Sequence, residues 1–519
     1  MKSFILAVCV LAWVMSASAA SVSTNAAAGP PVKKRYIVTL KPETSADAFV
    51  AQRNLKPRKM LPKARSGFAA NLAGNEALIM PRLNMVICDL DSDEVHTARK
   101  DSGVLAVEED GPVSLCMQTN ATGIVRMGVD QFPVARINGT NEPIDVTVAV
   151  IDSGIDPHPD LTVAHFWSPF TSDPKDELGH GTGVAGVIGA LDNDFGVVGV
   201  APGVRLWNIK VTDAIHNDWT DFLEGMYYCY EHADEIAVAN MSFVNTGTSA
   251  PINAMQGFVG LMVDAGIVVV AAAGNNNRDL AGVDGIFGNG DDAVPAALPQ
   301  SMAVSAMNPT NDAFWIDNPG VLGSNFSQIQ RTNIPFGATV ANYVVSPGGA
   351  IDVAAPGVGI LTTHTNGSYA RFKGTSMAAP HVAGLVALYI AANGRATNAA
   401  GVYAIRQAIV NASLPQSQWN TNNTADPDTN PEPLAIATEA WIPKPDFTNV
   451  VPVPGNYQVS FAAVPGYDYA VQTSTNLADP GAWQAFASVT GSNFVTTATA
   501  TDTNLAAQKF YRLKRSPAP

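Results

Sequence analysis

From about residue 117 onward, short apolar segments alternate with longer stretches that read as helices. The apolar segments include VTVAVID, LWNIKV, GIVVVAAAG and MAVSAM. This alternation predicts a parallel sheet with helices on both faces, because a crossover must carry the chain back before the next parallel strand begins. We therefore predict an α/β, three-layer domain over residues 117–435.

Two smaller units are predicted to flank this domain. Residues 35–115 contain RYIVTLK, which alternates like a half-buried strand, then NMVICDL and a helix-like segment, so we expect a compact α+β unit. Residues 446–519 hold short strand-like runs divided by Pro, Gly, Asp and Asn, which predicts a small antiparallel β-sandwich. Polar, proline-rich residues near 411–434 are interpreted as a linker between domains.

The N-terminus has the features of a secretory leader. Lys2 precedes an apolar run from Phe4 to Val14, and the small residues Ala17, Ser18 and Ala19 follow. We interpret residues 1–19 as a signal peptide cut after Ala19, since the run is shorter than the ~20 residues of a membrane-spanning helix. No later segment reads as a membrane span, so we expect a secreted, soluble protein.

Charge and cysteine content narrow the possible partners. Acidic residues outnumber Lys and Arg by 45 to 30, and the net charge is -15, so we do not expect nucleic acid as a partner. Of the four cysteines, Cys9 lies in the leader and Cys88 in the first small unit. Whether Cys116 and Cys229 pair is left open, and Cys229 reads as a buried helix residue.

Three polar residues stand where a catalytic centre could form. Asp152 ends the strand VTVAVID, at the sheet edge where open α/β sheets bind ligands. His180 opens the helix-like HGTGVAGVIGA, and Ser376 follows Gly374 at the start of a buried helix. Each residue alone could simply cap a helix or close a turn. Together they could act as a nucleophile, its base and the group that orients the base.

The segments VAVIDSGID, HGTGVAG and GTSMAAPHVAG resemble the three signature blocks of the subtilisin-like serine proteases, the subtilases of peptidase family S8. They also follow that family's chain order of Asp, His and Ser. The resemblance implies a subtilisin-type fold and a serine endopeptidase with Asp152, His180 and Ser376 as its triad. A catalytically silent scaffold and a processing protease dedicated to one partner are the alternatives.

The same resemblance extends to the oxyanion and to the substrate. GIVVVAAAGNN is similar to the family's oxyanion-hole strand, which implies that Asn275 donates its side-chain amide to the oxyanion together with the Ser376 N–H. IAVANMSFVN resembles the substrate-binding segment, beside which a polypeptide would add as an antiparallel strand. Glycine is common in the family where Val244 stands, so a subsite would be narrower here. The implied substrate-binding residues are Ser242, Phe243, Val244, Ala273 and Gly274.

ALDNDFGVVGVAPG looks like the family's high-affinity calcium loop. An ordinary turn at Asp192 and Asn193 is the alternative. Oxygen ligands of the implied kind suit a hard cation. The resemblance implies a structural calcium ion held by the side chains of Gln118, Asp160 and Asn193 and by the backbone of Leu191, Phe195 and Val197.

DGIFGNGDD is a second, weaker calcium candidate. It lacks the closing Glu of an EF-hand loop, and a solvated acidic loop is the alternative. Its possible ligands are Asp284, Asn289, Asp291 and Asp292.

The flanking units also carry resemblances. YIVTLK and DSGVLAVEED are similar to the family's inhibitory propeptide, which implies that residues 20–116 form a pro-segment that blocks the cleft until the enzyme cuts it off, near Leu115 to Met117. Residues 446–519 loosely resemble β modules of secreted bacterial enzymes, with binding, docking, export or spacing as open roles. We expect a monomer, and aromatic residues of this module that are mostly core: Tyr467, Tyr469, Trp483 and Phe510.

Overall fold

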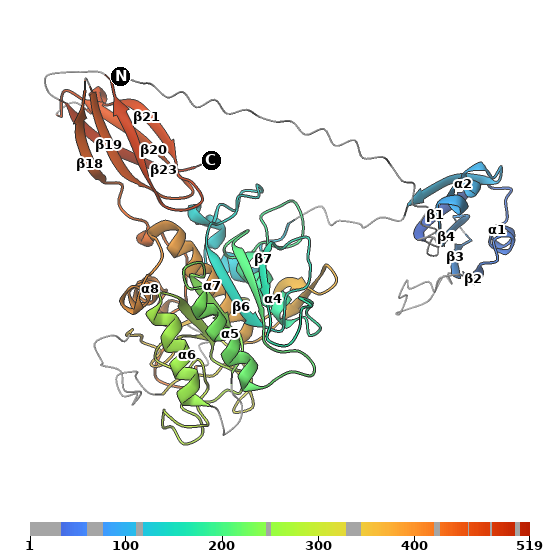
Figure 1. The fold of residues 1–519 in the computed structure, drawn as a ribbon, viewed down its shortest axis with the longest axis horizontal. Coiled ribbons are helices and arrows are strands. Elements are labelled where there is room, and N and C mark those ends of the chain that lie inside the picture. The colour runs from blue at the N-terminus through green and yellow to red at the C-terminus, as the bar shows by residue number, and fades with distance from the viewer. Residues whose placement is uncertain are drawn as a thin grey trace, which may run out of the picture. The chain divides into compact units, whose positions relative to one another are not determined.

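The computed structural model of the protein describes residues 33–59, 76–81, 83–109, 118–244, 251–328, 344–419, 426–454, 456–477, 480–503 and 509–518. The predicted signal peptide, Cys116 and the predicted maturation bond lie outside these ranges. The chain divides into two compact units, Met1–Ser114 and Leu115–Pro519, which are described separately (Figure 1).

The first unit is a five-stranded sheet with two helices, in strand order β2-β3-β4-β1-β5. Strand β1 pairs antiparallel with both β4 and β5. Helix α2 begins with a capping box, in which Asp91 and Glu94 each accept a backbone N–H of the other. Cys88 is buried in the core of this unit. The elements are β1 (Lys34–Leu40), α1 (Ala46–Gln52), β2 (Lys56–Lys59), β3 (Glu76–Met80), β4 (Met85–Leu90), α2 (Ser92–Lys100) and β5 (Val104–Glu109).

An eight-stranded sheet forms the centre of the second unit, in the order β12-β11-β10-β9-β6-β8-β7, with β15 also paired to β11. All of these pairs are parallel except β11 with β12. The domain is therefore mixed α/β, as the alternation predicted. The strands are β6 (Thr147–Asp152), β7 (Val163–Trp167), β8 (Arg205–Lys210), β9 (Val238–Met241), β10 (Val268–Ala272), β11 (Met302–Asn308), β12 (Ala313–Phe314) and β15 (Val353–Pro356).

Helices cover the central sheet. Helix α7 packs on α4 and on β9, β10 and β11, whereas α5 packs on α6 and on β6 (Figure 1). Because every residue of β6 and β10 is buried, both faces of the sheet are covered. Cys229 lies in α5 and is buried, as expected. The helices are α3 (Thr122–Arg126), α4 (His180–Gly189), α5 (Trp219–Glu231), α6 (Ile252–Asp264), α7 (Thr375–Asn393) and α8 (Ala399–Ala412).

Helix α7 bears on the expectation that no segment after the leader spans a membrane. With 19 residues and a mean hydropathy of 1.4, it is long and apolar enough to cross a membrane by length and composition. However, 94% of its apolar window is buried inside the folded domain. The helix is apolar on all sides because it is surrounded by protein, as a core helix is.

The predicted linker near 411–434 was wrong in part. Residues Leu414 and Leu434 pair as an isolated bridge, and Leu434 and Trp419 are buried in a small core with Met307. The described parts of this segment are therefore packed against the domain, because two bulky apolar residues outweigh the polar, proline-rich composition around them.

The C-terminal strands form two three-stranded antiparallel sheets, β18-β19-β22 and β21-β20-β23. Phe461 of one sheet lies against Tyr469 of the other, with ring centroids 5.3 Å apart. Tyr467 and Tyr469 are buried as expected, while Trp483 lies under the Arg512 guanidinium. The strands are β18 (Phe447–Val453), β19 (Asn456–Ala463), β20 (Tyr467–Ser474), β21 (Gln484–Thr490), β22 (Thr496–Asp502) and β23 (Phe510–Pro517).

These sheets contact the α/β domain at the amino ends of its strands. The Asp145 N–H donates to the Asn493 carbonyl at 3.3 Å, and the Val495 N–H donates to the Ala391 carbonyl at 2.8 Å. Asp145 precedes β6, and Asp152 ends it, so the contact lies at the opposite end of this strand from the candidate catalytic carboxylate. Two small hairpins complete the unit, β13 (Ile316–Asn318) with β14 (Leu322–Gly323), and β16 (Ile360–His364) with β17 (Ser368–Phe372).

Candidate active site

Asp152 and His180 meet at the carboxyl edge of the central sheet. Asp152 is the last residue of β6 and His180 is the first of α4, and His180 Nδ1 lies 2.8 Å from Asp152 Oδ1. The same carboxylate oxygen accepts the Ser153 backbone N–H at 2.7 Å, and Asp152 is 5% exposed. The structure thus brings together two of the three residues predicted as a triad, in a hydrogen bond that would orient the imidazole.

A second buried carboxylate, Asp176, fixes the start of the helix that carries His180. Its Oδ2 accepts the Thr182 backbone N–H at 2.8 Å and the Thr182 hydroxyl at 2.7 Å, and its Oδ1 accepts the Gly179 N–H at 2.8 Å. These bonds satisfy N–H groups that a helix N-terminus leaves without partners. Asp176 was not among the residues predicted from the sequence. An Asp placed shortly before a helix start was the available signal.

The pKa of His180 is raised above its ordinary value. Burial alone would lower it, but the charge of Asp152, the hydrogen bond to Asp152 and the charge of Asp176 outweigh that effect. His180 therefore gains its proton at a higher pH than an isolated histidine does.

Ser376 lies in the first turn of α7, directly after a glycine turn. Gly374 has φ +141°, which L side chains rarely adopt. A Cβ at Gly374 would lie 3.2 Å from Ser376 Oγ and 3.3 Å from Asn275 Nδ2. The hydroxyl and the amide thus border the same small space, which a larger residue at position 374 would fill.

Thr375 sets the orientation of the Asn275 amide. Asn275 Oδ1 accepts the Thr375 N–H at 2.8 Å and the Thr375 hydroxyl at 2.9 Å, while the Gly274 N–H donates to that hydroxyl at 3.0 Å. Because the carbonyl end of the amide is held, its NH2 end is the one that can donate into the space beside Ser376. Thr375 is a supporting residue that the sequence analysis did not single out.

The predicted substrate-binding segment is hydrogen-bonded to the backbone of Ser376. The Ser242 hydroxyl donates to the Ser376 carbonyl at 2.9 Å, and Phe243 packs on Phe222 with ring centroids 4.4 Å apart. Val244 lies beside Gly274, where a Cβ would meet Val244 Cγ1 at 3.1 Å. Two of the predicted substrate-binding residues are buried. Ser242 is 6% exposed and spends its hydroxyl on Ser376, and Ala273 is buried as well.

The predicted calcium residues cluster around Asp160, which is fully buried. Asp160 accepts the Asn193 amide at 2.9 Å, the Val197 N–H at 3.0 Å and the Tyr369 hydroxyl at 3.1 Å. Gln118 donates to the Leu191 carbonyl at 2.8 Å, and the Phe195 N–H donates to Asn193 Oδ1 at 3.1 Å. All six predicted residues are therefore neighbours, and Tyr369 joins them.

This donor set fits a hard cation. Its only charged group is Asp160, and the other predicted donors are amide and backbone oxygens, as in many calcium sites. Gly196 is needed for the close approach, since a Cβ there would lie 2.5 Å from Asp160 Oδ2. Many metal centres gather three or more His, Cys, Asp or Glu side chains, whereas this cluster has a single carboxylate. The described part of the chain has no group of that kind arranged to hold a metal.

The side chains of the second calcium candidate, the loop 283–292, form hydrogen bonds within the loop itself. Asp291 accepts the Val283 N–H at 2.7 Å, Asp292 accepts the Gly288 N–H at 2.7 Å, and Asn289 donates to Asp284 at 2.9 Å. These contacts are those of an acidic loop that satisfies its own turns.

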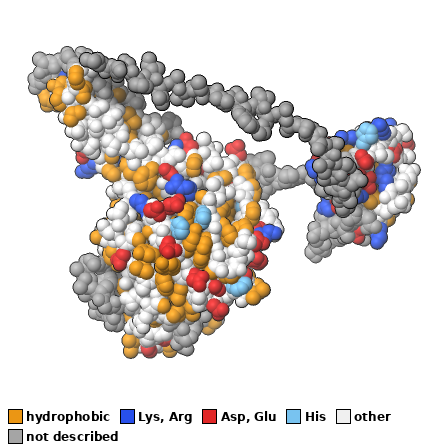
Figure 2. All heavy atoms as spheres, in the orientation of Figure 1, with side chains coloured by type: hydrophobic (Ala, Val, Ile, Leu, Met, Phe, Trp, Pro, Cys, Tyr) orange, Lys and Arg blue, Asp and Glu red, His pale blue; other side chains and the backbone are white. Residues whose placement is uncertain are grey.

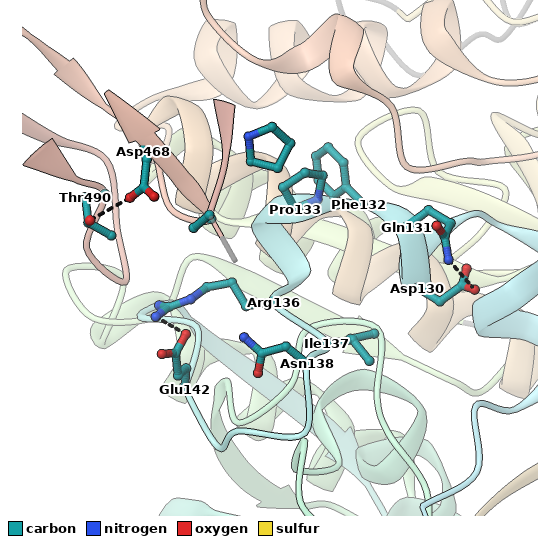
Figure 3. Close-up of a pocket in the computed structure, with 14 residues that line it drawn as sticks. Asp130, Gln131, Phe132, Pro133, Arg136, Ile137, Asn138, Glu142, Asp468 and Thr490 are labelled. Carbon is teal, nitrogen blue, oxygen red and sulfur yellow. Dashed lines mark hydrogen bonds and ion pairs between the residues drawn. The ribbon is translucent and has the colours of Figure 1, made fainter. Parts of the chain in front are cut away.

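A separate cavity of about 680 Å³ lies between residues 130–142 and the C-terminal strands (Figure 3). Arg136 pairs with Glu142 at its wall, and Thr490 donates to Asp468 at 2.6 Å. The cavity shares no residue with the cluster around Ser376.

Figure 2 shows acidic side chains spread over the drawn face of the larger unit, among Lys and Arg.

The comparison with known proteins defines the class. Residues 144–433 match the subtilase family, whose members are serine endopeptidases, and this match covers more than half of the chain. The chain therefore belongs to the subtilase family, and the predicted family and enzyme class are confirmed.

Individual relatives agree with this assignment. The chain is 33% identical to subtilisin E of Bacillus subtilis (strain 168) over 386 residues, which covers 73% of this chain and 86% of that protein. It is 32% identical over 374 residues to alkaline elastase YaB of Bacillus sp. (strain YaB), covering 72% and 85%. It is 30% identical over 374 residues to an alkaline protease of Shouchella clausii, with the same coverage.

Proposed function

We propose that this subtilase is a secreted bacterial endopeptidase, made as an autoprocessed zymogen, that hydrolyses polypeptides through an acyl-enzyme on Ser376. One observation carries the proposal: Thr375 orients Asn275 so that its amide nitrogen and the Ser376 hydroxyl border one space at Gly374. A nucleophile beside a fixed donor is what attack on a carbonyl requires, since the charge develops next to the attacking oxygen.

In the proposed mechanism, His180 takes the proton of the Ser376 hydroxyl as Oγ attacks the scissile carbonyl carbon. Asp152 holds His180 Nδ1–H and stabilises the imidazolium. The Asn275 amide and the Ser376 N–H, at the start of α7, donate to the oxyanion. His180 then protonates the leaving amine, and water, deprotonated by His180, hydrolyses the ester.

Replacement of Asn275 by leucine is expected to lower kcat by about 10²- to 10³-fold with little change in KM, as for the corresponding donor in subtilisin. The donor acts on the oxyanion, which forms only in the transition state. Steady-state kinetics on a chromogenic peptide measure the effect. Asn276→Ala is the matched control, because Asn276 contacts Asn325 through its backbone N–H. An unchanged kcat in Asn275→Leu would remove Asn275 from the mechanism.

The pH profile should respond to Asp176. Neutral His180 is the base, so activity is lost as the pH falls through the raised pKa of His180. Asp176→Asn removes a negative charge that raises this pKa, so the acidic limb of the kcat/KM profile should move to lower pH. The control is Asp173→Asn, an exposed carboxylate on the same loop. A limb that stays in place or moves to higher pH contradicts the assignment.

Secretion and zymogen processing are supported by the leader-like residues 1–19 and by the compact unit that precedes Leu115. The test is to express the full chain and follow both removal of residues 20–116 and casein hydrolysis, with and without a serine-directed fluorophosphonate. We expect processing, labelling and casein cleavage. If the chain keeps residues 20–116 and does not react with the fluorophosphonate, the proposal of an active, autoprocessed endopeptidase is refuted. Processing and labelling with intact casein would favour a dedicated processing protease.

We also propose a structural calcium ion at the Asp160 cluster, held by Gln118, Asp160, Asn193 and the backbone oxygens of Leu191, Phe195 and Val197. When bound, the ion supplies charge to balance the buried carboxylate and ties residue 118 to the loop 191–197. Binding at 100 times Kd adds about 2.7 kcal/mol to the stability of the folded state. Calcium should therefore raise the Tm of the Ser376→Ala chain, and Asn193→Ala should reduce that rise. An equal rise in both chains contradicts this site.

A further inference from the structure

Four carboxylates from two distant parts of the chain lie near one another in what we term the C-terminal acidic cluster, which comprises Asp279, Asp426, Asp428 and Glu432. Asp428 Oδ2 accepts the Ser327 N–H at 3.0 Å, and Asp279 Oδ2 accepts the next N–H, that of Gln328, at 2.7 Å. The fold thus holds these acids against the same short backbone segment. In the described part of the chain, no Lys or Arg forms an ion pair with any of the four.

Glu432 is the residue that needs a partner. It is 0% exposed, and in the described part of the chain its carboxylate oxygens find no donor other than the Asp426 carboxyl and its own backbone N–H. Its charged neighbours are the carboxylates of Asp426 and Asp428. A buried carboxylate that faces other carboxylates is costly unless a cation balances it.

The backbone prevents Glu432 from turning to solvent. A Cβ at Gly348 would lie 2.7 Å from Glu432 Cγ, so this glycine makes room for the glutamate. The Ala354 N–H donates to the carbonyl of the next residue, Pro433, at 2.9 Å, which fixes the chain to β15. On the other side of the cluster, the Gln416 amide donates to Asp426 Oδ2 at 2.8 Å. The carboxylates are therefore held together by packing that does not itself neutralise them.

We propose that the C-terminal acidic cluster binds a calcium ion, with Glu432 and Asp426 as its charged ligands. No three carboxylates of the cluster converge as they stand, so amide and backbone oxygens complete the coordination, as calcium's flexible shell of six to eight oxygens allows. Structural zinc sites are built mainly from Cys and His, and magnesium keeps several waters, which a fully buried Glu432 disfavours. This site shares no residue with the Asp160 cluster.

The ion would stabilise the segment that follows Asn275, the proposed oxyanion donor. Asp279 lies four residues after Asn275, and the intervening N–H groups of Asn276 and Arg278 donate to Asn325 Oδ1 at 3.1 and 3.2 Å. Asn325 Nδ2 in turn donates to the Ala273 carbonyl at 2.9 Å. Asp428 and Asp279 hold the adjacent N–H groups of Ser327 and Gln328, so a cation bound at residues 426–432 would also steady the segment that follows Asn275.

The test counts calcium ions by equilibrium dialysis against CaCl2, in the full chain carrying Ser376→Ala. Glu432→Gln should bind one ion fewer than its parent, and Asp426→Asn should weaken the same site. Asp264→Asn, which removes an exposed carboxylate of α6, should bind as many ions as the parent. Asn193→Ala should still bind the ion of the C-terminal acidic cluster.

Thermal melts give an independent readout. In EDTA, Glu432→Gln should melt at a higher temperature than the parent, because it removes a carboxyl group that must either be buried as a charge or take up a proton. In excess calcium the order should reverse. Equal calcium counts in Glu432→Gln and the parent overturn the proposal and indicate a proton held between Glu432 and Asp426 instead. If the Asn193→Ala chain binds no calcium, the proposal is also overturned. This second test leaves all four acids of the C-terminal acidic cluster unchanged, so it does not depend on whether a variant of the cluster folds.

Discussion

Replacing Ser376 with alanine is expected to lower kcat for peptide hydrolysis by on the order of 10⁶-fold, the size of effect that loss of the nucleophile has in subtilisin. The proposed reaction proceeds through an ester on Ser376 Oγ, and no other group replaces that oxygen. The oxyanion donors remain, so a residual rate of roughly 10³-fold or more over water should persist.

The comparison needs protein of equal purity and fold. Kinetics on a chromogenic peptide measure the loss, and circular dichroism verifies the fold of the variant. Ser172→Ala is the control, because Ser172 is exposed on the loop before Asp176. More than one hundredth of the parent's activity in Ser376→Ala would exclude Ser376 as the nucleophile.

Asp152→Asn should lower kcat by about 10⁴-fold. The hydrogen bond between Asp152 Oδ1 and His180 Nδ1, at 2.8 Å, holds the tautomer that leaves Nε2 free to accept a proton. An asparagine amide can donate to Nδ1 instead, which favours the wrong tautomer, and it cannot stabilise the imidazolium.

The control for Asp152 lies at the other end of the same strand. Asp145 precedes β6 and pairs with Arg205, so Asp145→Asn changes the charge of this strand region without reaching His180. We expect near-normal kinetics from that variant. A loss of less than tenfold in Asp152→Asn would show that His180 does not depend on this carboxylate.

Much of the site could be predicted because its residues lie in short contiguous blocks. Asp152 ends an apolar strand and Ser376 follows a glycine turn before an apolar helix, so local sequence places each at an element's end. The α/β architecture followed from the alternation of apolar segments for the same reason. Asp176 was missed because an Asp shortly before a helix start indicates only a cap, whereas its charge effect on His180 depends on where the folded loop places it.

The approach of Asp279 to the acids of residues 426–432 could not be predicted. Asp279 and Asp428 are far apart in the sequence, and their meeting at residues 327 and 328 depends on the complete fold. The segment around Glu432 has the polar, proline-rich composition of a linker. Composition carries no information about Trp419 and Leu434, which hold that segment against the domain.

The central claim is that Ser376 is the nucleophile, and the most direct test is to locate the fluorophosphonate adduct on the purified chain by peptide mass spectrometry. The account predicts one adduct, on Ser376 in the segment FKGTSMAAPH, and none in the Ser376→Ala chain. It also predicts weaker labelling in Asp152→Asn, since His180 would be a poorer base. An adduct on any other serine, or undiminished labelling of Ser376→Ala, would contradict it.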